Sequence, residues 1–204
     1  FQFRDKSKPV LKKDTISLWF KVAAACIPGA IATLLFDDFI EENFHTPMVI
    51  AAALIVYGIA FILTERWNED SAPKILSLYE ITYKTAIAIG LFQVLSIVPG
   101  RSRSGATILG ALIIGVSRVA AAEFTFFLAI PVMFGLSAVK ILKFGFSFTG
   151  TELLVLVLGM AVAFIVSMLV IKFLMSYIRK HDFKVFGWYR IVLGIIVILY
   201  FTVF

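Results

Sequence analysis

The chain has 204 residues, of which 61% are apolar and only 16% are charged. Soluble globular domains carry about 45–50% apolar and about 25% charged residues, so this composition excludes an ordinary soluble fold and indicates a polytopic membrane protein. The formal net charge is +6, but the basic residues cluster in short gaps between apolar segments, where they are typical of topology signals and not of a nucleic-acid interface.

The chain contains a single cysteine, Cys26, which excludes an intrachain disulfide and a cysteine metal cluster. Stability must therefore come from helix packing in lipid. The first residues, FQFRDKSK, include no methionine and do not follow the signal-peptide pattern of a charged start, an apolar middle and a small-residue cleavage site. We expect that the true N-terminus of the protein precedes this sequence.

A membrane-spanning helix needs about 20 predominantly apolar residues. Five segments of the chain meet this requirement: 16–36, 47–64, 119–139, 152–178 and 186–204. The sequence therefore predicts an all-α polytopic membrane protein with about five transmembrane helices.

A sixth apolar segment, 83–116, is interrupted by the stretch VPGRSRSGATILG. The interruption leaves arms of about 16 and about 12 residues, and the second arm would cover about 18 Å of about 30 Å of hydrocarbon. Arms this short favour a re-entrant helix-loop-helix that enters and leaves the membrane on one side. Two full crossings would preserve the topology of the remaining chain, so loop charge does not decide between these alternatives.

Lysine and arginine residues in the loops indicate the orientation in the membrane. The leading segment carries five of them, whereas the next gap, FDDFIEENFHTP, is acidic and carries none. The start is therefore predicted to be cytoplasmic, and Lys140 and Lys143 are exceptions that lie outside. The other cytoplasmic positions are Arg66, Lys74, Lys84, Arg118 and the stretch YIRKHDFK.

The interruption itself has the composition of an anion site. A non-helical backbone at membrane depth is tolerated only where its polar groups are satisfied, so we expect it to house something polar. Ser104 is the expected N-cap of a helix from about Ala106, whose free N–H groups and positive dipole end attract anions. The guanidinium of Arg103 and the hydroxyls of Ser102, Ser104 and Thr107 complete a predicted phosphate cradle.

A purely structural interpretation is the alternative. Arginines beside a helix end often extend to the membrane interface, and Ser/Gly clusters often serve close helix packing. We expect Arg101 to lie at the interface, because adjacent side chains diverge and Arg103 stands closer to the helix start.

Other polar residues also lie within apolar segments, and three of them bear on the site. Glu123 is expected to cap its helix or to form a structural ion pair, with Arg118 as the candidate partner. Gln93 either forms a hydrogen bond between helices or lines the pocket. Arg190 lies near the end of its span and is expected to extend to the membrane interface.

The two histidines do not indicate a histidine-dependent site. His45 and His181 fall in loops, and neither has a carboxylate or histidine partner four residues away. Lipid phosphatases of the acid-phosphatase type have the pattern Ser-Arg, five further residues and then a histidine, and this chain has Phe124 at that place in SRVAAAEF. Their Pro-Ser-Gly-His signature is also absent, so that class is excluded.

Three stretches follow one another in a specific order: FQVLSIVPGRSRSGATILGALIIGVSR, AAEFTFFLAIPVMFG and WYR. Together they closely resemble the second half of the bacterial undecaprenyl-diphosphate phosphatases of the BacA type. The resemblance implies an integral-membrane hydrolase that removes the terminal phosphate from undecaprenyl diphosphate. Such an enzyme regenerates the C55 lipid carrier for peptidoglycan and other envelope polymers, and it confers bacitracin resistance.

The resemblance also implies an architecture. The fold would contain two inverted repeats, each with a re-entrant hairpin, that meet at the active site. In this chain, a single integral-membrane domain over 1–204 would comprise the remainder of the first repeat and a connector in 1–77. The second repeat would occupy 78–204, with its hairpin at 83–116.

Matching the PGxSRSGAT pattern by position assigns the site residues. The resemblance implies that Arg103 binds the diphosphate and that Ser102 and Thr107 join it as catalytic residues. The further substrate-binding candidates are Ser104, Gly105, Gly100 and Gln93.

The family also has a glutamate-rich box ending in Pro-Val-Ser-Ser-Thr-Gly-His, which this sequence does not contain. In the family this box supplies carboxylates, which would hold a divalent cation, Mg²⁺ or Ca²⁺, and a histidine. No metal ligand is therefore predicted from the residues present. The attacking group, water or serine, stays open at this point.

The expected partners are undecaprenyl diphosphate and membrane lipid, and a homodimer is the assembly to test. We expect a multi-pass protein of the bacterial cytoplasmic membrane, with an active site that opens toward the periplasm. A lipid-phosphate transporter or flippase is the alternative function, because many carriers also combine inverted repeats with broken helices. Phosphate release without a membrane gradient would distinguish the two.

Overall fold

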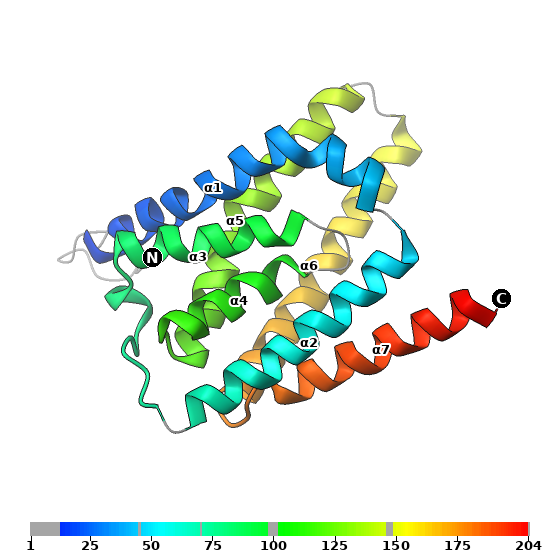
Figure 1. The fold of residues 1–204 in the computed structure, drawn as a ribbon. Coiled ribbons are helices and arrows are strands. Elements are labelled where there is room, and N and C mark those ends of the chain that lie inside the picture. The colour runs from blue at the N-terminus through cyan, green and yellow to red at the C-terminus, as the bar shows by residue number, and fades with distance from the viewer. Residues whose placement is uncertain (1–12, 45, 70, 98–101, 146–148, 204) are drawn as a thin grey trace.

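A computed structural model describes residues 13–44, 46–69, 71–97, 102–145 and 149–203 of the chain (Figure 1). Over these ranges the secondary structure is helical apart from turns, connecting segments and one isolated bridge. The helices are α1 (Lys13–Phe44), α2 (Pro47–Glu69), η1 (Leu78–Glu80), α3 (Tyr83–Val94), η2 (Leu95–Ile97), α4 (Arg103–Ile114), α5 (Arg118–Phe144), α6 (Gly150–Ile178) and α7 (Lys184–Val203).

Helices α1, α2, α5, α6 and α7 are long and apolar enough to cross a membrane. Each contains most or all of one predicted span, so the predicted all-α membrane fold is confirmed. In α1 the apolar part is Asp14–Thr33, and the helix continues to Phe44 through an acidic stretch. The remaining α-helices, α3 and α4, have 12 residues each, or about 18 Å at 1.5 Å per residue.

Helices α3 and α4 lie side by side and run in opposite directions (Figure 1). Phe92 of α3 packs against Gly110 of α4, where an added Cβ would lie 2.3 Å from the phenylalanine ring. The prediction of two short helices over 83–116 is confirmed, although η2 forms the last part of the first arm. Re-entry on one side of the membrane stays a prediction.

Backbone hydrogen bonds join the two ends of this hairpin. The N–H of Lys74 donates to the carbonyl of Gly115 at 2.8 Å, and the N–H of Ser117 donates to the carbonyl of Ile75 at 2.8 Å. Ile75 and Val116 form an isolated parallel bridge. Gly115 has a φ of 95°, a left-handed conformation that glycine adopts readily and that ends α4. The chain therefore enters α3 and leaves α4 at the same end of the molecule.

Helix α4 lies in the middle of the bundle. Every residue of α4 from Gly105 to Leu112 is buried, and the helix contacts α2, α3 and α5. One apolar cluster combines residues of α1, α3, α4 and α5, and another combines residues of α2, α4 and α5 with the connection between α6 and α7. Helix α4 is thereby held inside the protein from Gly105 to Leu112, while Arg103 and Ser104 at its start are exposed.

Small residues let α2 and α7 approach closely. A Cβ added to Gly187 would lie 2.8 Å from the carbonyl oxygen of Gly58, and one added to Gly194 would lie 2.8 Å from that of Ala51. Because the residue numbers fall along α2 as they rise along α7, the two helices are antiparallel. Close approach of this kind is a usual means of helix association in lipid.

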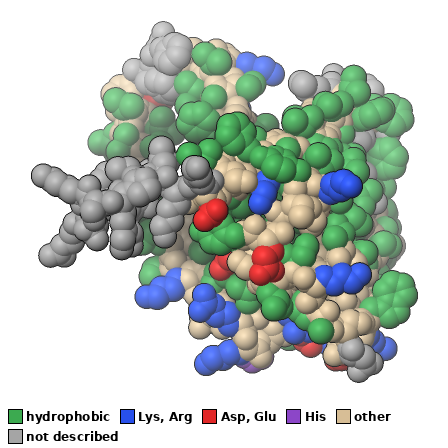
Figure 2. Space-filling view, turned by 90° about the vertical axis from the view of Figure 1, so that its left-hand side faces the viewer, with side chains coloured by type: hydrophobic (Ala, Val, Ile, Leu, Met, Phe, Trp, Pro, Cys, Tyr) green, Lys and Arg blue, Asp and Glu red, His purple; other side chains and the backbone are tan. Residues whose placement is uncertain are grey.

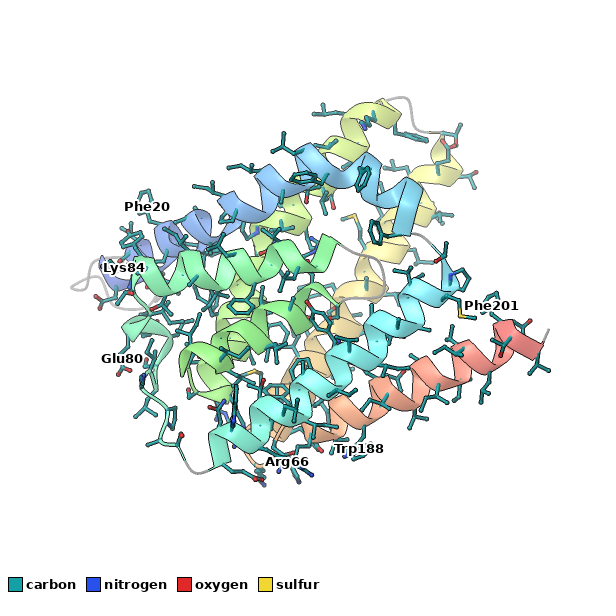
Figure 3. The ribbon with its side chains drawn as sticks, in the orientation of Figure 1. Phe20, Arg66, Glu80, Lys84, Trp188 and Phe201 are labelled. Atoms are coloured by element: carbon teal, nitrogen blue, oxygen red, sulfur yellow. The ribbon has the colours of Figure 1, made fainter. Side chains whose placement is uncertain are left out.

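Charged residues gather at the end where α2 finishes and α5 begins. Figure 2 looks onto this side of the molecule and shows basic and acidic side chains interspersed among apolar ones. Figure 3 shows Glu80 and Lys84 on the same side of the molecule, and Phe201 on the opposite side near the C-terminus. This distribution agrees with the predicted grouping of Lys84 with the other loop cations.

One ion pair at this end joins a buried carboxylate to a partly exposed guanidinium. The carboxylate of Glu65 is fully buried and accepts hydrogen bonds from Arg118 Nη2 at 2.5 Å and from Arg118 Nε at 3.0 and 3.1 Å. The backbone N–H of Phe183 also donates to Glu65, at 3.0 Å. Pairing of Arg118 with Glu123, which the sequence suggested, is therefore wrong. Glu65 instead joins α2, α5 and the start of α7.

Candidate functional site

The first turn of α4 is capped by Ser102. This residue has extended backbone angles, φ −67° and ψ 127°, and its Oγ accepts the N–H of Gly105 at 3.2 Å. Its carbonyl accepts the N–H of Ala106 at 3.0 Å, which is the first helical hydrogen bond. The prediction that Ser104 caps a helix from about Ala106 is therefore wrong. The helix begins at Arg103, which is three residues before the predicted start at about Ala106.

This geometry leaves a helix end with free backbone N–H groups. The N–H groups of Arg103 and Ser104 occupy the first two helical positions, for which the helix provides no carbonyl partner. Ser104 is exposed, and its Oγ lies 2.9 Å from Ser102 Oγ. A helix N-terminus with free N–H groups and hydroxyls beside it attracts phosphate.

Arg103 is the first residue of α4 and is exposed. Within the described ranges its side chain makes neither an ion pair nor a hydrogen bond, so its five N–H donors are available. Its backbone carbonyl accepts a hydrogen bond from Thr107 Oγ1 at 3.2 Å. Gly100 and Arg101, which the sequence placed in the site and at the interface, lie outside the described residues.

Thr107 is fully buried one turn into the helix. Its Oγ1 lies 3.0 Å from the carbonyl of Ser104 and accepts a hydrogen bond from Thr125 of α5 at 3.1 Å. The hydroxyl therefore joins α4 to α5 beside the first turn of α4. Thr125 was not singled out from the sequence, because an isolated threonine in an apolar span carries no signal of its partner.

Arg190 is the unexpected member of this site. A Cβ added to Gly105 would lie 2.7 Å from Arg190 Nη2 and 3.1 Å from Nη1, so the guanidinium lies directly against the first turn of α4. Its Cζ lies 5.4 Å from the centroid of the Phe61 ring. The prediction that Arg190 extends to the membrane interface is therefore wrong. Two sequence signals were present: an arginine seven residues into an apolar helix, and its place in the WYR stretch.

Gln93 lies in the last turn of α3 and is buried. A Cβ added to Gly29 of α1 would lie 2.9 Å from Gln93 Nε2, so the side chain packs between the two helices. Its buried Oε1 has no hydrogen-bond partner among the described residues. The side chain packs against α1, but no hydrogen bond from it to another helix is found among the described residues. Both alternatives raised by the sequence, a hydrogen bond between helices and a role toward substrate, stay predictions.

The cavity at the opposite end of α4 is a different feature. It has a volume of about 390 Å³ and is lined by residues that include Glu65, Asn68, Lys74, Arg118 and Arg179. Arg118 is already paired with Glu65 there. The predicted phosphate cradle is at the N-terminus of α4, whereas this cavity surrounds its C-terminus.

Comparisons with known proteins agree with the resemblance seen in the motifs. Residues 1–196 match the family described as bacitracin resistance protein BacA. A protein of Enterococcus faecalis named undecaprenyl-diphosphatase is 67% identical over 199 residues, which cover 98% of this chain and 72% of that protein. A protein of the same name from Lachnoclostridium phytofermentans is 59% identical over 98% of this chain and 72% of its own length. A third, from Desulfitobacterium hafniense, is 58% identical over 94% of this chain and 69% of its own length.

Proposed function

The chain belongs to the bacitracin resistance protein BacA family, and from this membership we infer that it is a multi-pass membrane undecaprenyl-diphosphatase. It hydrolyses undecaprenyl diphosphate to undecaprenyl phosphate and inorganic phosphate. This reaction returns the lipid carrier to peptidoglycan and envelope synthesis. The names of the relatives favour this function over the transporter alternative.

The observation that supports this function most directly is the polar first turn of α4, which lies against α5 and α7. We propose that the N–H groups of Arg103 and Ser104 and the guanidinium of Arg103 bind the diphosphate. Ser102 and Thr107 belong to the same turn and would complete the catalytic group. Gly105 keeps this turn free of side-chain bulk.

Hydrolysis of a phosphoanhydride depends mainly on charge stabilisation and on alignment of the attacking oxygen. Arg103 would neutralise charge on the transferred phosphoryl group, because its planar fork can donate to two phosphate oxygens at once. The positive end of the α4 dipole would stabilise the same charge, and because the helix is fixed in place it need not reorganise during the reaction. The oxygen that attacks would belong to water or to a serine.

We also propose the divalent cation, Mg²⁺ or Ca²⁺, that the family resemblance implies. The described residues do not fit such a cation on their own, because no group of three or more His, Cys, Asp or Glu side chains gathers among them. The described side chains in contact with the first turns of α4, those of Ser102, Thr125 and Arg190, are neutral or cationic. Ligands for a cation would therefore come from outside the described part of the chain.

The orientation is a further proposal. The hairpin of α3 and α4 would enter the bacterial cytoplasmic membrane from the cytoplasmic side, where its basic flanks lie. The N-terminal turn of α4 would then be part-way across the membrane and open toward the periplasm. We propose a homodimer as the assembly, which light scattering of the protein in detergent would test.

Phosphate release tests the proposed function. Purified protein in detergent, with no membrane and no gradient, should release inorganic phosphate from undecaprenyl diphosphate. A transporter would move the lipid between leaflets of a vesicle without releasing phosphate. Transbilayer movement without phosphate release would therefore overturn the assignment.

A further inference from the structure

Arg190 brings a partly buried charge to the first turn of α4, where none of the described carboxylates pairs with it. It lies on α7, within a segment long and apolar enough to span the membrane. Its Nη1 is buried and has no hydrogen-bond partner among the described residues, and no described carboxylate forms an ion pair with it. Charged groups inside membrane segments are costly, and they usually face a partner or a functional site.

The position of the guanidinium indicates which site it faces. Its two terminal nitrogens and Cζ are the three atoms nearest to the position where Gly105 would carry a side chain. Gly105 is the third residue of α4, directly after the two residues whose N–H groups have no helical partner. The guanidinium and the free N–H groups therefore lie at the same turn, although they come from different helices.

A structural role is the alternative explanation. The Phe61 ring lies 5.4 Å from Arg190 Cζ, and this cation–π contact stabilises the charge to some extent. It does not satisfy the buried Nη1, because a ring face offers no hydrogen-bond acceptor in the plane of the guanidinium. The contact accounts for the orientation of the side chain and leaves its donors available.

We propose that Arg190 is a second phosphate-binding arginine, which grips the diphosphate from α7 while Arg103 and the N-terminus of α4 hold it from the other side. This inference rests on the proposed function. A terminal phosphate carries about −1.5 to −2 charges, whereas a helix N-terminus supplies about +0.5. Arg103 and the helix end together supply about +1.5, and Arg190 adds a second full positive charge from the described part of the chain.

Substitutions of Arg190 test the proposal in full-length protein purified in detergent. Arg190→Met keeps the apolar stem and removes the donors, and Arg190→Lys keeps only a point charge. Arg66→Gln is the matched control, because Arg66 is an exposed arginine at the end of α2. The measurements are kcat and KM for phosphate release from undecaprenyl diphosphate, and the thermal stabilisation of each protein by inorganic pyrophosphate.

We expect Arg190→Met to lower kcat/KM about 10- to 150-fold, which corresponds to loss of a hydrogen bond to a charged group. The concentration of pyrophosphate needed for half-maximal stabilisation should rise by a similar factor. Arg190→Lys should fall between Arg190→Met and the unmodified protein, and Arg66→Gln should match the unmodified protein. If Arg190 is merely structural, Arg190→Met will melt earlier while its folded fraction keeps the unmodified affinity for pyrophosphate, which overturns the proposal.

Gly105→Ala provides a second test that leaves the arginine in place. The added methyl group would occupy the position of the guanidinium and displace this flexible side chain, while alanine suits a helix better than glycine. Pyrophosphate affinity should fall. Arg190→Met should lower the pyrophosphate affinity less in the Gly105→Ala protein than in the unmodified protein, because both changes remove the same contact. Full additivity of the two losses would contradict the proposal.

The two readouts separate this inference from the proposed function. If the unmodified protein releases no phosphate but is stabilised by pyrophosphate through Arg190, the enzyme assignment fails and the phosphate site stands. If it releases phosphate and Arg190→Met changes neither kcat/KM nor the effect of pyrophosphate, the assignment stands and the role of Arg190 is refuted.

Discussion

Ser102 Oγ lies 2.9 Å from Ser104 Oγ at the start of α4, but only Ser102 accepts the N–H of Gly105. The two hydroxyls therefore have different roles in the helix. Ser102 satisfies a backbone donor of the first turn, and Ser104 is exposed beside it. Their effects on stability should differ accordingly.

Ser102→Ala should destabilise the protein by about 1 kcal/mol, because an N-cap serine is lost. Ser104→Ala should change the free energy of unfolding by less than about 0.5 kcal/mol, as expected for an exposed position. Thermal unfolding in detergent measures both, with Ser102→Asp as a control that retains a capping oxygen. A larger loss in Ser104→Ala than in Ser102→Ala would show that Ser104 is the true cap.

Arg103→Ala should abolish phosphate release and leave the unfolding temperature nearly unchanged, because the side chain is exposed and makes no ion pair within the described residues. Arg103→Lys should recover little activity, since an ammonium cannot donate to two phosphate oxygens in a planar fork. The measurement is kcat/KM for undecaprenyl diphosphate. Near-normal turnover in Arg103→Lys would indicate that the residue acts as a point charge.

Arg118→Met should destabilise the protein by about 3 kcal/mol, because it leaves the buried carboxylate of Glu65 without its cation. We expect the low end of the usual range, since the Arg118 side chain is 38% exposed. Combining Arg118→Met with Glu65→Gln should recover part of the loss, because the amide can still accept the N–H of Phe183. A double-mutant cycle from unfolding in detergent measures this coupling. Strictly additive losses would mean that the pair contributes nothing.

Cysteine labelling tests the hairpin. In a Cys26→Ser background, Lys84→Cys and Ile113→Cys place thiols at exposed positions near the two ends of the α3–α4 pair. Both should react with an impermeant thiol reagent only when it is applied to the cytoplasmic side. Lys140→Cys, near the far end of α5, is the control and should react only from the other side. Labelling of positions 84 and 113 from opposite faces would indicate two full crossings.

The spans were predictable because their length and apolarity are properties of single segments. The short arms of 83–116 were predictable for the same reason, and the structure has two helices of 12 residues there. The exact start of α4 was not. Ser102 and Ser104 are equally good capping residues, and the choice depends on which of them adopts the extended backbone before the helix.

Two side chains were misjudged because their surroundings are set by tertiary packing. Proximity along the chain suggested Glu123 as the partner of Arg118, whereas the partner is Glu65, which lies 53 residues away. Position near a span end suggested an interfacial Arg190. Its actual place depends on Gly58 and Gly187, which bring α2 and α7 together and so direct Arg190 toward α4. That contact cannot be predicted from the composition or length of any one segment.

The Ile75–Val116 bridge also has a consequence for folding. It turns the hairpin and its flanks into a closed loop of about 40 residues, and closing a flexible loop of that length costs about 3 kcal/mol in chain entropy. Contacts between α3 and α4, such as that of Phe92 with Gly110, span a shorter stretch and form at lower entropic cost. The two short helices should therefore pair first and shorten the loop that remains to be closed. The bridge should then form last, after the two helices have paired.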